Sequence, residues 1–541
     1  MITTSPSNKN IDHHDFTSMA TFLKASREYL SQSLSQQQAD ISSSSSSCSS
    51  SSPTLPHFVL GNPAGDADSI VSAIGLAYVD TIMVQQQQQQ QQLQFTDNDD
   101  NNNSNNSNNN SSPSMIVVPI MSISISDLKT QRPETTYLLK DCAGMTDLDL
   151  DQLIGMDELR TMDNSHLIVT HNTTVTLVDH NHHHHHHHTE NIDNNNSDID
   201  THTHIDTTVA DVSGWRVIEI VDHHKDEGHH YDTCIVRNIA FEESQPLVAS
   251  TCTLIVERFY QRAKRHKLQW PPTLSILLLG VILLDSVNML PGKGTPRDGV
   301  ALERLLEDTD WTQLTLPEEI TTDTTTGKPD PTKLFETLQA QKFSKTFWAG
   351  LTALQAIRMD YKAFPLSVPS KKSSSDGYLG IATILQDMDT FWTKDNVVQS
   401  MVQVIEEDNL QVLALMHTFL QDTVHDDGKD DDDDDKSNTT TTTTKTTQTK
   451  GGRQLVLASL DKDRLVHLLH YLTETVAVST LDTVVVDLEL TGYEHVSEEE
   501  QVSSSDLPAV YYVKMNQGNV KASRKQVAPI LTSFWNRNDD T

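Results

Sequence analysis

Short apolar runs recur along the chain, and polar or helix-like segments separate them. Several runs have the length and clustering of buried strands, namely residues 57–61, 115–118, 174–178 and 215–221. Longer segments have the apolar spacing of helices, namely residues 68–79, 247–258 and 274–284. We expect Pro119 to end the second strand, because proline contributes no N–H to a ladder. Strands that alternate with helices predict parallel pairing and an α/β domain reaching residue 310.

A stretch rich in Thr, Asp and Pro follows this domain and predicts a linker. The pattern of strands and helices then resumes. The strands expected after the linker cover residues 410–416, 454–458, 483–488 and 510–515, and the helices cover residues 464–472 and 524–534. These elements predict a second, smaller α/β domain.

Homopolymeric tracts interrupt both domains, and their lack of apolar residues predicts solvated loops or linkers. The tracts cover residues 42–52, 85–92, 101–112, 182–188, 430–435 and 439–444. The expected division is a disordered N-terminus over 1–15, a first domain over 16–310, a linker over 311–331 and a second domain over 332–541. The first domain carries insertions near 42–52, 84–113 and 182–210, and the second carries one near 421–452.

The formal net charge of -36 argues against binding nucleic acid or an acidic membrane through a basic surface. The four cysteines form no closely spaced pair, which predicts free thiols. The N-terminal residues lack the pattern of a signal peptide, and the longest apolar run, residues 276–284, is too short to span a bilayer. We expect a cytoplasmic protein with no membrane, nucleic-acid or obligate protein partner.

Acidic residues appear where predicted strands end. Residues 61–69 (GNPAGDADS) place Asp66 and Asp68 two positions apart in the turn between a strand and a helix. Two carboxylates so close repel each other unless a cation lies between them. The alternative is structural, because Asp68 and Ser69 are also typical residues for the start of a helix.

Three further motifs place a carboxylate at the end of an apolar strand or helix. Asp179 and the sequence Asp222-His223-His224 each follow an apolar strand, and Asp285 ends the most apolar helix. The adjacent histidines cannot point the same way, so one can bind a metal while the other reaches a substrate. Together these oxygen and nitrogen groups predict a site for Mg²⁺ or Mn²⁺ at the strand ends.

The order of these motifs resembles the DHH phosphoesterase superfamily, in particular the branch that holds eukaryotic exopolyphosphatase, prune and the family II inorganic pyrophosphatases. The likeness extends to S-R-K-Q at residues 523–526, which is similar to the ending of that family's DHHA2 domain. The resemblance implies an α/β protein in which a parallel-sheet DHH domain precedes a smaller α/β DHHA2-like domain. It also implies an active site in the cleft between them.

The resemblance implies a role for each matching residue. Two divalent cations, Mg²⁺ or Mn²⁺ with Co²⁺ as an alternative, would be held by Asp66, Asp68, Asp179, His223 and Asp285, with Asp179 bridging. Asp222 would orient the histidine pair, and His224 would contact phosphate and donate a proton to the leaving oxygen. The groups expected to bind substrate phosphate are His224, Lys362, Arg524 and Lys525.

One departure narrows the expected activity. Family II pyrophosphatases begin the first motif with a histidine, whereas this chain has Asn62, as the exopolyphosphatase and prune branch does. The chain also keeps both histidines, followed by Lys225, as exopolyphosphatases do. The implied activity is an exopolyphosphatase that releases the terminal phosphate of inorganic polyphosphate through a metal-activated water. The alternatives are a prune-type short-chain polyphosphatase or phosphodiesterase, a family II-like pyrophosphatase, and a non-catalytic adaptor.

Overall fold

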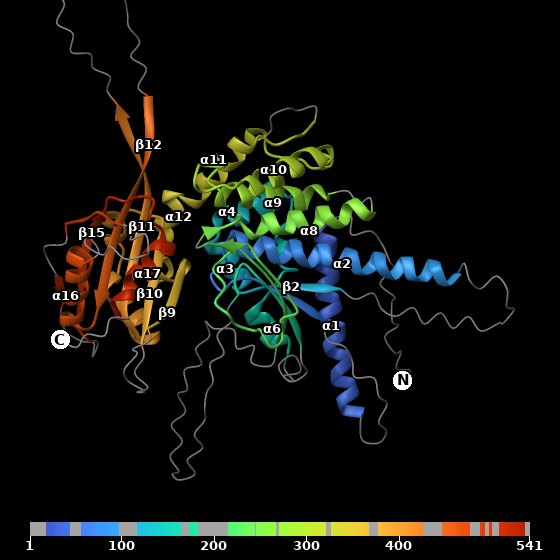
Figure 1. The fold of residues 1–541 in the computed structure, drawn as a ribbon, viewed down its shortest axis with the longest axis horizontal. Helices are drawn as coiled ribbons and strands as arrows, with labels where there is room; N and C mark the ends of the chain where they lie inside the picture. The colour runs from blue at the N-terminus through green and yellow to red at the C-terminus, as the bar shows by residue number, and fades with distance from the viewer. Residues whose placement is uncertain are drawn as a thin grey trace, which may run out of the picture. The chain divides into compact units, whose positions relative to one another are not determined.

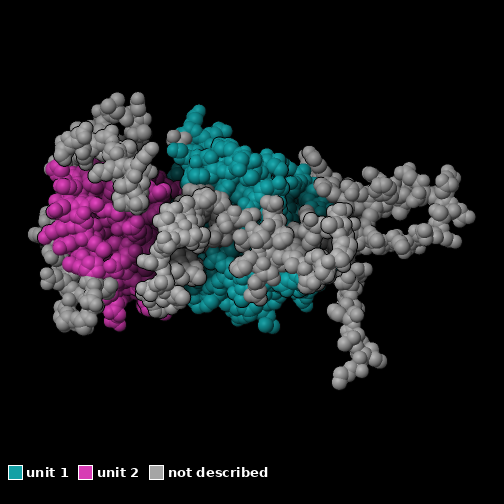
Figure 2. Space-filling model, turned by 90° about the horizontal axis from the view of Figure 1, so that it is seen from below, with its two compact units in different colours: residues 1–341 teal, residues 342–541 magenta. Residues whose placement is uncertain are grey.

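The described residues of the computed structural model form two compact units, Met1–Gln341 (unit 1) and Lys342–Thr541 (unit 2) (Figure 2). The structure describes residues 18–43, 56–96, 116–163, 173–181, 215–243, 245–266, 270–320, 326–366, 377–425, 446–475, 487–492, 497–499 and 508–535. Within these ranges Cys142, Cys234 and Cys252 are free thiols, as expected.

A parallel sheet forms the centre of unit 1 (Figure 1). Within the described residues its six strands lie in the order β3-β2-β1-β4-β5-β6, and every neighbouring pair is parallel. The strands are β1 (His57–Leu60), β2 (Val117–Met121), β3 (Ile154–Gly155), β4 (Thr174–Val178), β5 (Arg216–Asp222) and β6 (Val236–Ile239). The winding direction reverses between β1 and β4, so the carboxyl ends of these two strands flank the point where open α/β sheets bind ligands.

Both faces of this sheet are buried. Val59 of β1 belongs to the core that includes α2, α8 and α9, whereas Phe58 and Leu60 face a second core with side chains of α1 and α6. Burial on both faces explains why the central strands β1 and β2 consist almost wholly of apolar residues. The helices of unit 1 are α1 (Met19–Ser43), α2 (Ala67–Thr96), α3 (Ile125–Gln131), α4 (Pro133–Tyr137), α5 (Asp147–Leu150), α6 (Met156–Met162), α8 (Thr251–His266), α9 (Pro272–Asp285), α10 (Pro296–Asp308) and α11 (Pro331–Lys342).

Helix α2 contains a segment, Ala67–Gln86, that is long and apolar enough to cross a membrane. Most of it, 83%, is buried inside the unit, where α2 packs on α8, α9 and β2. We therefore interpret α2 as a core helix.

Unit 2 contains a mixed sheet with helices on both faces (Figure 1). Its described strands follow the order β13-β15-β12-β11-β10-β9, with β14 also paired to β15, and only β10 and β11 are parallel. The strands are β9 (Tyr361–Pro365), β10 (Tyr378–Ile384), β11 (Leu410–His425), β12 (Thr446–Ser459), β13 (Leu490–Thr491), β14 (Ser497–Glu499) and β15 (Val510–Gln517). The helices are α12 (Lys345–Gly350), α13 (Ala353–Met359), α14 (Met388–Trp392), α15 (Val397–Glu407), α16 (Lys462–His470) and α17 (Arg524–Trp535). The expected succession of a parallel-sheet domain and a second α/β domain is confirmed.

The prediction that Pro119 ends a strand is wrong, because β2 continues through it to Met121. The carbonyl of Ile120 accepts a hydrogen bond from Gly61 and so faces β1. The preceding proline nitrogen therefore faces the opposite side, where β3 pairs only with Ile120 and Met121. At that position proline removes no ladder hydrogen bond.

Two tracts differ from the expected loops. The glutamine tract at residues 85–92 continues α2, and α1, which was not predicted, includes the first residues of the serine tract. Glutamine is a good helix former, so a tract that follows a stable helix extends it. The tracts at 101–112, 182–188, 430–435 and 439–444 lie outside the described residues, as does most of 42–52.

The division between the units falls later than the expected linker at 311–331. The second domain was expected to begin at residue 332, but Leu334 and Leu338 of α11 are fully buried in the core of unit 1. Residues 487 and 488 do not belong to a strand, although we expected one over 483–488, and residues 483–486 lie outside the described ranges.

Candidate metal centre

Asp179 lies directly after β4 at the switch point of the sheet and is 2% exposed. Its backbone has φ 62°, a left-handed conformation that aspartate tolerates better than most residues. Asn62, which follows β1, donates from Nδ2 to the Asp179 backbone oxygen at 3.1 Å and to Oδ2 at 3.4 Å. The Asn62 amide oxygen accepts from Ala64 N, so its NH₂ group must face Asp179.

His223 follows β5 and lies beside two of the predicted carboxylates. Its Nδ1 pairs with the Val248 carbonyl at 3.2 Å, so this nitrogen carries the proton. Its Nε2 then faces Asp179 Oδ1, 3.4 Å away, and Asp68 Oδ2, 3.9 Å away. A histidine whose other nitrogen donates to a carbonyl has the usual arrangement of a metal ligand.

The Asp68 carboxylate is held by the start of α8, 182 residues away in sequence. Ser250 Oγ donates to Oδ1 at 2.6 Å, Thr251 N to Oδ2 at 2.8 Å, and Cys252 N to Oδ1 at 3.1 Å. The Thr251 hydroxyl also lies 3.5 Å from Asp179 Oδ1. Asp68 is 4% exposed, and these donors satisfy the oxygens of a buried carboxylate and fix its direction.

Asp222 orients the ring of His224. Asp222 Oδ1 accepts from His224 Nδ1 at 2.8 Å and from the backbone N–H groups of His223 and His224. Burial opposes ionisation of Asp222, but the hydrogen bond and charge of His224 prevail and leave its pKa below the usual range. The expectation that Asp222 orients both rings holds for His224 alone, because the His223 ring is held by Val248.

The two remaining predicted ligands belong to the same part of unit 1. Asp66 precedes α2, and its Oδ1 accepts from Ser69 N at 3.1 Å, so this carboxylate caps the helix, the role that we had considered for Asp68 and Ser69. Asp285 is the last residue of α9. Burial and then the negative charges of Asp68 and Asp285 raise the pKa of the Cys252 thiol well above its usual value. The Asp285 carboxylate thus lies close enough to Cys252 to raise the pKa of its thiol, and the backbone N–H of Cys252 donates to Asp68.

The geometry fits a divalent cation. Ligand atoms of Asp179, His223 and His224 all lie within 4.8 Å of one another. Carboxylate oxygens with one or two imidazole nitrogens form a donor set that suits Mg²⁺, Mn²⁺ and similar ions. Buried like charges such as Asp68 and Asp179 are stabilised by a cation between them.

Several supporting residues were not predicted. Asn181 donates to Asp222 Oδ2 at 2.6 Å and to the Lys225 carbonyl at 2.9 Å, and it accepts from Glu227 N. It therefore ties the turn after β4 to the turn after β5. The sequence feature that could have identified Asn181 as a site residue is its position two residues after Asp179. Ser250 lies inside the helix expected over residues 247–258, so the sequence pattern gave no signal of its role; α8 begins only at Thr251.

The phosphate-binding residues expected in unit 2 lie at the start of α17 and on β9. Gln526 caps the start of α17: Ser523 N and Oγ both donate to Gln526 Oε1 at 2.8 and 2.7 Å, which is one half of a capping box. The sequence S-R-K-Q therefore begins a helix and places Arg524 and Lys525 in its first turn. Arg524 donates to Asp360 at 2.7 Å, two residues before Lys362 on β9. These cations thus come from neighbouring segments of unit 2.

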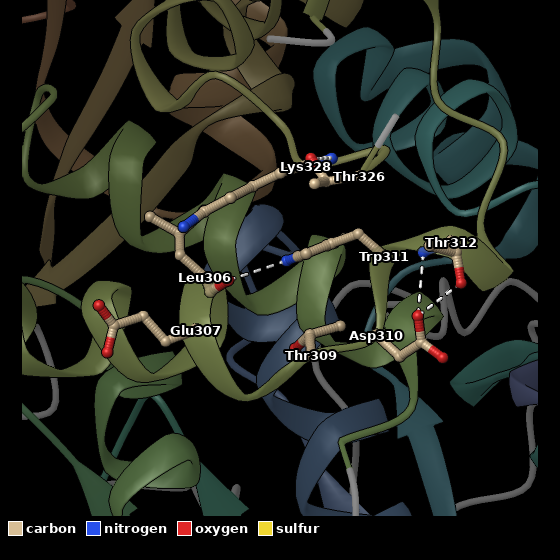
Figure 3. A pocket seen from close by; sticks show the side chains of 8 residues that line it. All are labelled: Leu306, Glu307, Thr309, Asp310, Trp311, Thr312, Thr326 and Lys328. Atoms are coloured by element: carbon tan, nitrogen blue, oxygen red, sulfur yellow. Dashed lines mark hydrogen bonds between the residues drawn. The ribbon is translucent and has the colours of Figure 1, made fainter. Parts of the chain in front are cut away.

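A pocket elsewhere in unit 1 contains none of the predicted site residues (Figure 3). Trp311 forms part of it and donates from Nε1 to the Leu306 carbonyl at 3.1 Å, while Asp310 caps the following turn through Thr312. Its lining is Leu306, Glu307, Thr309, Asp310, Trp311, Thr312, Thr326 and Lys328. It is separate from the candidate metal centre.

The fold and the site define a class of protein: a parallel α/β domain with a carboxylate and histidine centre at its switch point, followed by a mixed-sheet α/β domain. Two family models match these parts. The model described as the DHH family, N-terminal domain, matches residues 57–281, and the DHHA2 domain model matches residues 337–534. The chain therefore carries a DHH-family N-terminal domain and, in its second half, a DHHA2 domain.

Individual relatives are distant. Over 258 residues the chain is 26% identical to a Schizosaccharomyces pombe (strain 972 / ATCC 24843) protein named "Putative exopolyphosphatase". That match covers 46% of this chain and 49% of the other, so the chain spans about half the length of the curated relative. A solved structure, "Crystal structure of Methanococcus jannaschii putative family II inorganic pyrophosphatase", is 16% identical, with a TM-score of 0.43 over 89% of this chain and 100% of that chain.

Proposed function

We propose that this chain is a cytoplasmic, divalent-metal-dependent exopolyphosphatase that hydrolyses the terminal phosphoanhydride bond of inorganic polyphosphate. The observation that supports it most is the convergence of three side chains from separate segments of unit 1: Asp179 Oδ1 lies 3.4 Å and Asp68 Oδ2 lies 3.9 Å from His223 Nε2. The DHH-family N-terminal domain and the S. pombe relative's name favour a phosphoanhydride substrate.

The residues proposed to hold two cations, Mg²⁺ or Mn²⁺ with Co²⁺ as an alternative, are Asp66, Asp68, Asp179, His223 and Asp285. When bound, such cations lower the pKa of a water molecule and offset the charge of phosphate oxygens. The protein's own contribution is to satisfy these buried carboxylates with hydrogen-bond donors and to fix their direction. The donors at the start of α8 do this for Asp68, and Asn62 does it for Asp179.

His224 is the proposed proton donor to the leaving phosphate. Its side chain is 29% exposed, far more than that of His223 at 7%, so it can meet a substrate. The anionic Asp222 stabilises the protonated imidazole through Nδ1 and leaves Nε2 to exchange a proton with the leaving oxygen. The shortened chain departs once it is protonated, and no covalent intermediate with the protein is needed.

Arg524, Lys525 and Lys362 are the groups that we propose to bind the phosphate chain from the DHHA2 domain. The ion pair with Asp360 holds the Arg524 guanidinium beside β9, and the first turn of α17 adds the partial positive charge of a helix start. Guanidinium groups bind phosphate in a bidentate manner, which lysine cannot do.

A phosphate-release assay tests the proposal and separates it from its rivals. The purified full-length chain should release phosphate from long-chain polyphosphate with Mg²⁺, Mn²⁺ or Co²⁺ and lose this activity in a chelator. A higher kcat/KM on tripolyphosphate or a cyclic nucleotide would favour the prune-type enzyme, and one on pyrophosphate would favour a pyrophosphatase. Absence of release from every substrate with every metal would favour a non-catalytic adaptor.

The variant Asp179→Ala tests the centre itself. Because this side chain faces both histidines and Asn62, its removal should lower kcat by at least about 10³-fold while the protein stays folded by circular dichroism. Retention of a tenth of the activity would contradict the bridging role. Asp226→Ala, in the turn after β5 but paired with Arg237, is the matched control and should keep most activity.

A further inference from the structure

Asp298 is a fully buried carboxylate, 0% exposed, that the proposed chemistry does not use. It occupies the third position of α10 and forms a capping box with Thr295, whose N and Oγ both donate to Asp298 Oδ2 at 2.8 Å. A buried carboxylate is strongly destabilising unless donors surround it. The capping box alone satisfies one of its two oxygens.

The other donors to Asp298 come from the turn that begins α8, residues 248–253, which we call the α8 turn. The backbone N–H of Ala249 lies 3.1 and 2.9 Å from the two carboxylate oxygens, and Thr253 Oγ1 donates to Oδ1 at 2.6 Å. Asp298 therefore binds the α8 turn at both of its ends, over a sequence distance of 45 to 49 residues.

Other residues of the same turn hold the candidate metal centre. Ser250 Oγ, Thr251 N and Cys252 N donate to Asp68, and the Val248 carbonyl fixes the His223 ring. One side of the α8 turn thus meets Asp298, and the other side meets two of the proposed metal ligands. A shift of the turn by a few tenths of an ångström would misalign both ligands together.

We propose that Asp298 is a positioning residue for the metal centre: it clamps the α8 turn, and the turn aims the Asp68 carboxylate and the His223 imidazole. This inference rests on the proposed function, because it takes Asp68 and His223 to be metal ligands. It adds a residue that touches neither metal nor substrate and acts through hydrogen bonds alone.

The variant Asp298→Asn tests the clamp. It keeps the shape of the side chain but replaces an acceptor oxygen with an NH₂ group, which faces donors and cannot accept from them. Residues that support metal ligands through hydrogen bonds typically change metal affinity by about 10- to 100-fold. We expect the Mn²⁺ dissociation constant of the substrate-free, full-length protein to rise at least about 10-fold, measured by the electron paramagnetic resonance of free Mn²⁺.

Arg297→Gln is the matched control. Arg297 precedes Asp298 and also fastens α10 to α8, through bonds from Nε and Nη2 to Glu257 at 2.8 and 2.6 Å. Glu257 is not part of the α8 turn, so this variant weakens the same helix pair without moving Asp68. Its Mn²⁺ dissociation constant should stay within about twofold of the wild type, whatever its thermal midpoint.

Each outcome decides a separate point. If Asp298→Asn lowers the thermal midpoint but binds Mn²⁺ as the wild type does, or if Arg297→Gln loses affinity equally, the clamp is overturned as a positioning device. If wild-type protein binds no Mn²⁺, the proposed function fails first. Should Asp298→Asn not fold, Ser250→Ala removes one of the three donors that the α8 turn gives to Asp68, and an unchanged Mn²⁺ affinity in that variant would overturn the proposal in its place.

Discussion

The adjacent residues His223 and His224 differ in the partner of their Nδ1 atom, and this difference gives them different candidate roles. His223 donates from Nδ1 to a backbone carbonyl, which turns its Nε2 toward two carboxylates. His224 donates from Nδ1 to an anionic carboxylate, which favours its protonated form. The two rings stand nearly perpendicular, at 81°, with centroids 4.5 Å apart. The sequence of two histidines therefore encodes one candidate ligand and one candidate acid.

This difference predicts the effect of Asp222→Asn. The pKa of Asp222 lies below its usual range, so the group is an anion at every working pH and supports protonated His224. Its neutral replacement should lower the pKa of His224 and move the alkaline limb of the kcat profile to lower pH. Profiles of kcat against pH from 5 to 9, with polyphosphate as substrate, measure the shift.

Asp226→Asn provides the comparison for that experiment. Asp226 lies four residues later and pairs with Arg237 rather than with either histidine. The alkaline limb of the kcat–pH profile of Asp226→Asn should coincide with that of the wild type. An equal shift in both variants would show that the general charge of this turn, and not the bond to His224, sets the profile.

At the level of elements, the site depends on how each loop is fastened to the sheet. Arg132, at the start of α4, is 5% exposed and donates from Nε to the Gly65 carbonyl at 2.7 Å, with a second bond from Nη2 to the Ala64 carbonyl. These hydrogen bonds fix the loop between β1 and α2, which contains Asp66 and leads directly to Asp68 in the first turn of α2. Residue 65 has φ +57°, and a Cβ there would meet Ile123, so glycine is required at this bend.

We expect Arg132→Lys to weaken both stability and metal binding. A lysine cannot donate in two fixed directions, so at least one buried carbonyl loses its charged partner, which costs about 1.5–3 kcal/mol. Urea unfolding measures the stability and a Mn²⁺ titration measures the site. Arg27→Lys is the control: Arg27 also joins carbonyls, those of Asp151 and Leu153, but on a different loop, so it should lose stability with no loss of Mn²⁺ affinity. Equal loss of affinity in both variants would contradict the assignment.

At the level of the whole molecule, protonation and net charge limit stability and turnover. His417 on β11 is 0% exposed, with Nδ1 paired to the Gln386 carbonyl at 3.0 Å. Burial lowers the pKa of His417 to about 4 from 6.5. The unfolded chain therefore binds a proton below pH 6.5 that the folded chain does not accept until about pH 4.

Stability should fall as the pH drops through this window. The stabilisation from a neutral His417 is complete above pH 6.5 and is lost between pH 6.5 and 4, by about 3 kcal/mol in total. His417→Gln cannot titrate, so between pH 7 and pH 5 it should lose about 2 kcal/mol less stability than the wild type. Urea midpoints at the two pH values test this, and parallel losses in both proteins would contradict it.

The net charge of -36 opposes the approach of an anionic substrate. Salt screens this repulsion, since the Debye length falls from about 30 Å at 0.01 M to about 10 Å at 0.1 M. We therefore expect kcat/KM on long polyphosphate to rise over that range while kcat stays constant. A steady fall of kcat/KM with salt would show that local cations such as Arg524 dominate the encounter.

The sequence by itself predicted a set of candidate metal ligands and their approximate place in the fold. Apolar strands buried on both faces have a recognisable sequence pattern. A polar residue at the carboxyl end of such a strand lies at the edge of the sheet where ligands bind. Asp68, Asp179 and His223 could therefore be assigned to one site without coordinates. Local sequence also predicted the helix that starts at Arg524.

Only the tertiary structure decided which groups hold those ligands in place. Ser250 meets Asp68 across 182 residues, and Asp298 meets the α8 turn across 45 to 49 residues. No periodicity encodes such pairs, because they depend on how α2, α8 and α10 pack together. The same reason explains Pro119, whose place inside β2 depends on where a neighbouring strand begins to pair. Local pattern specifies elements, whereas partners distant in sequence are selected by packing of the whole unit.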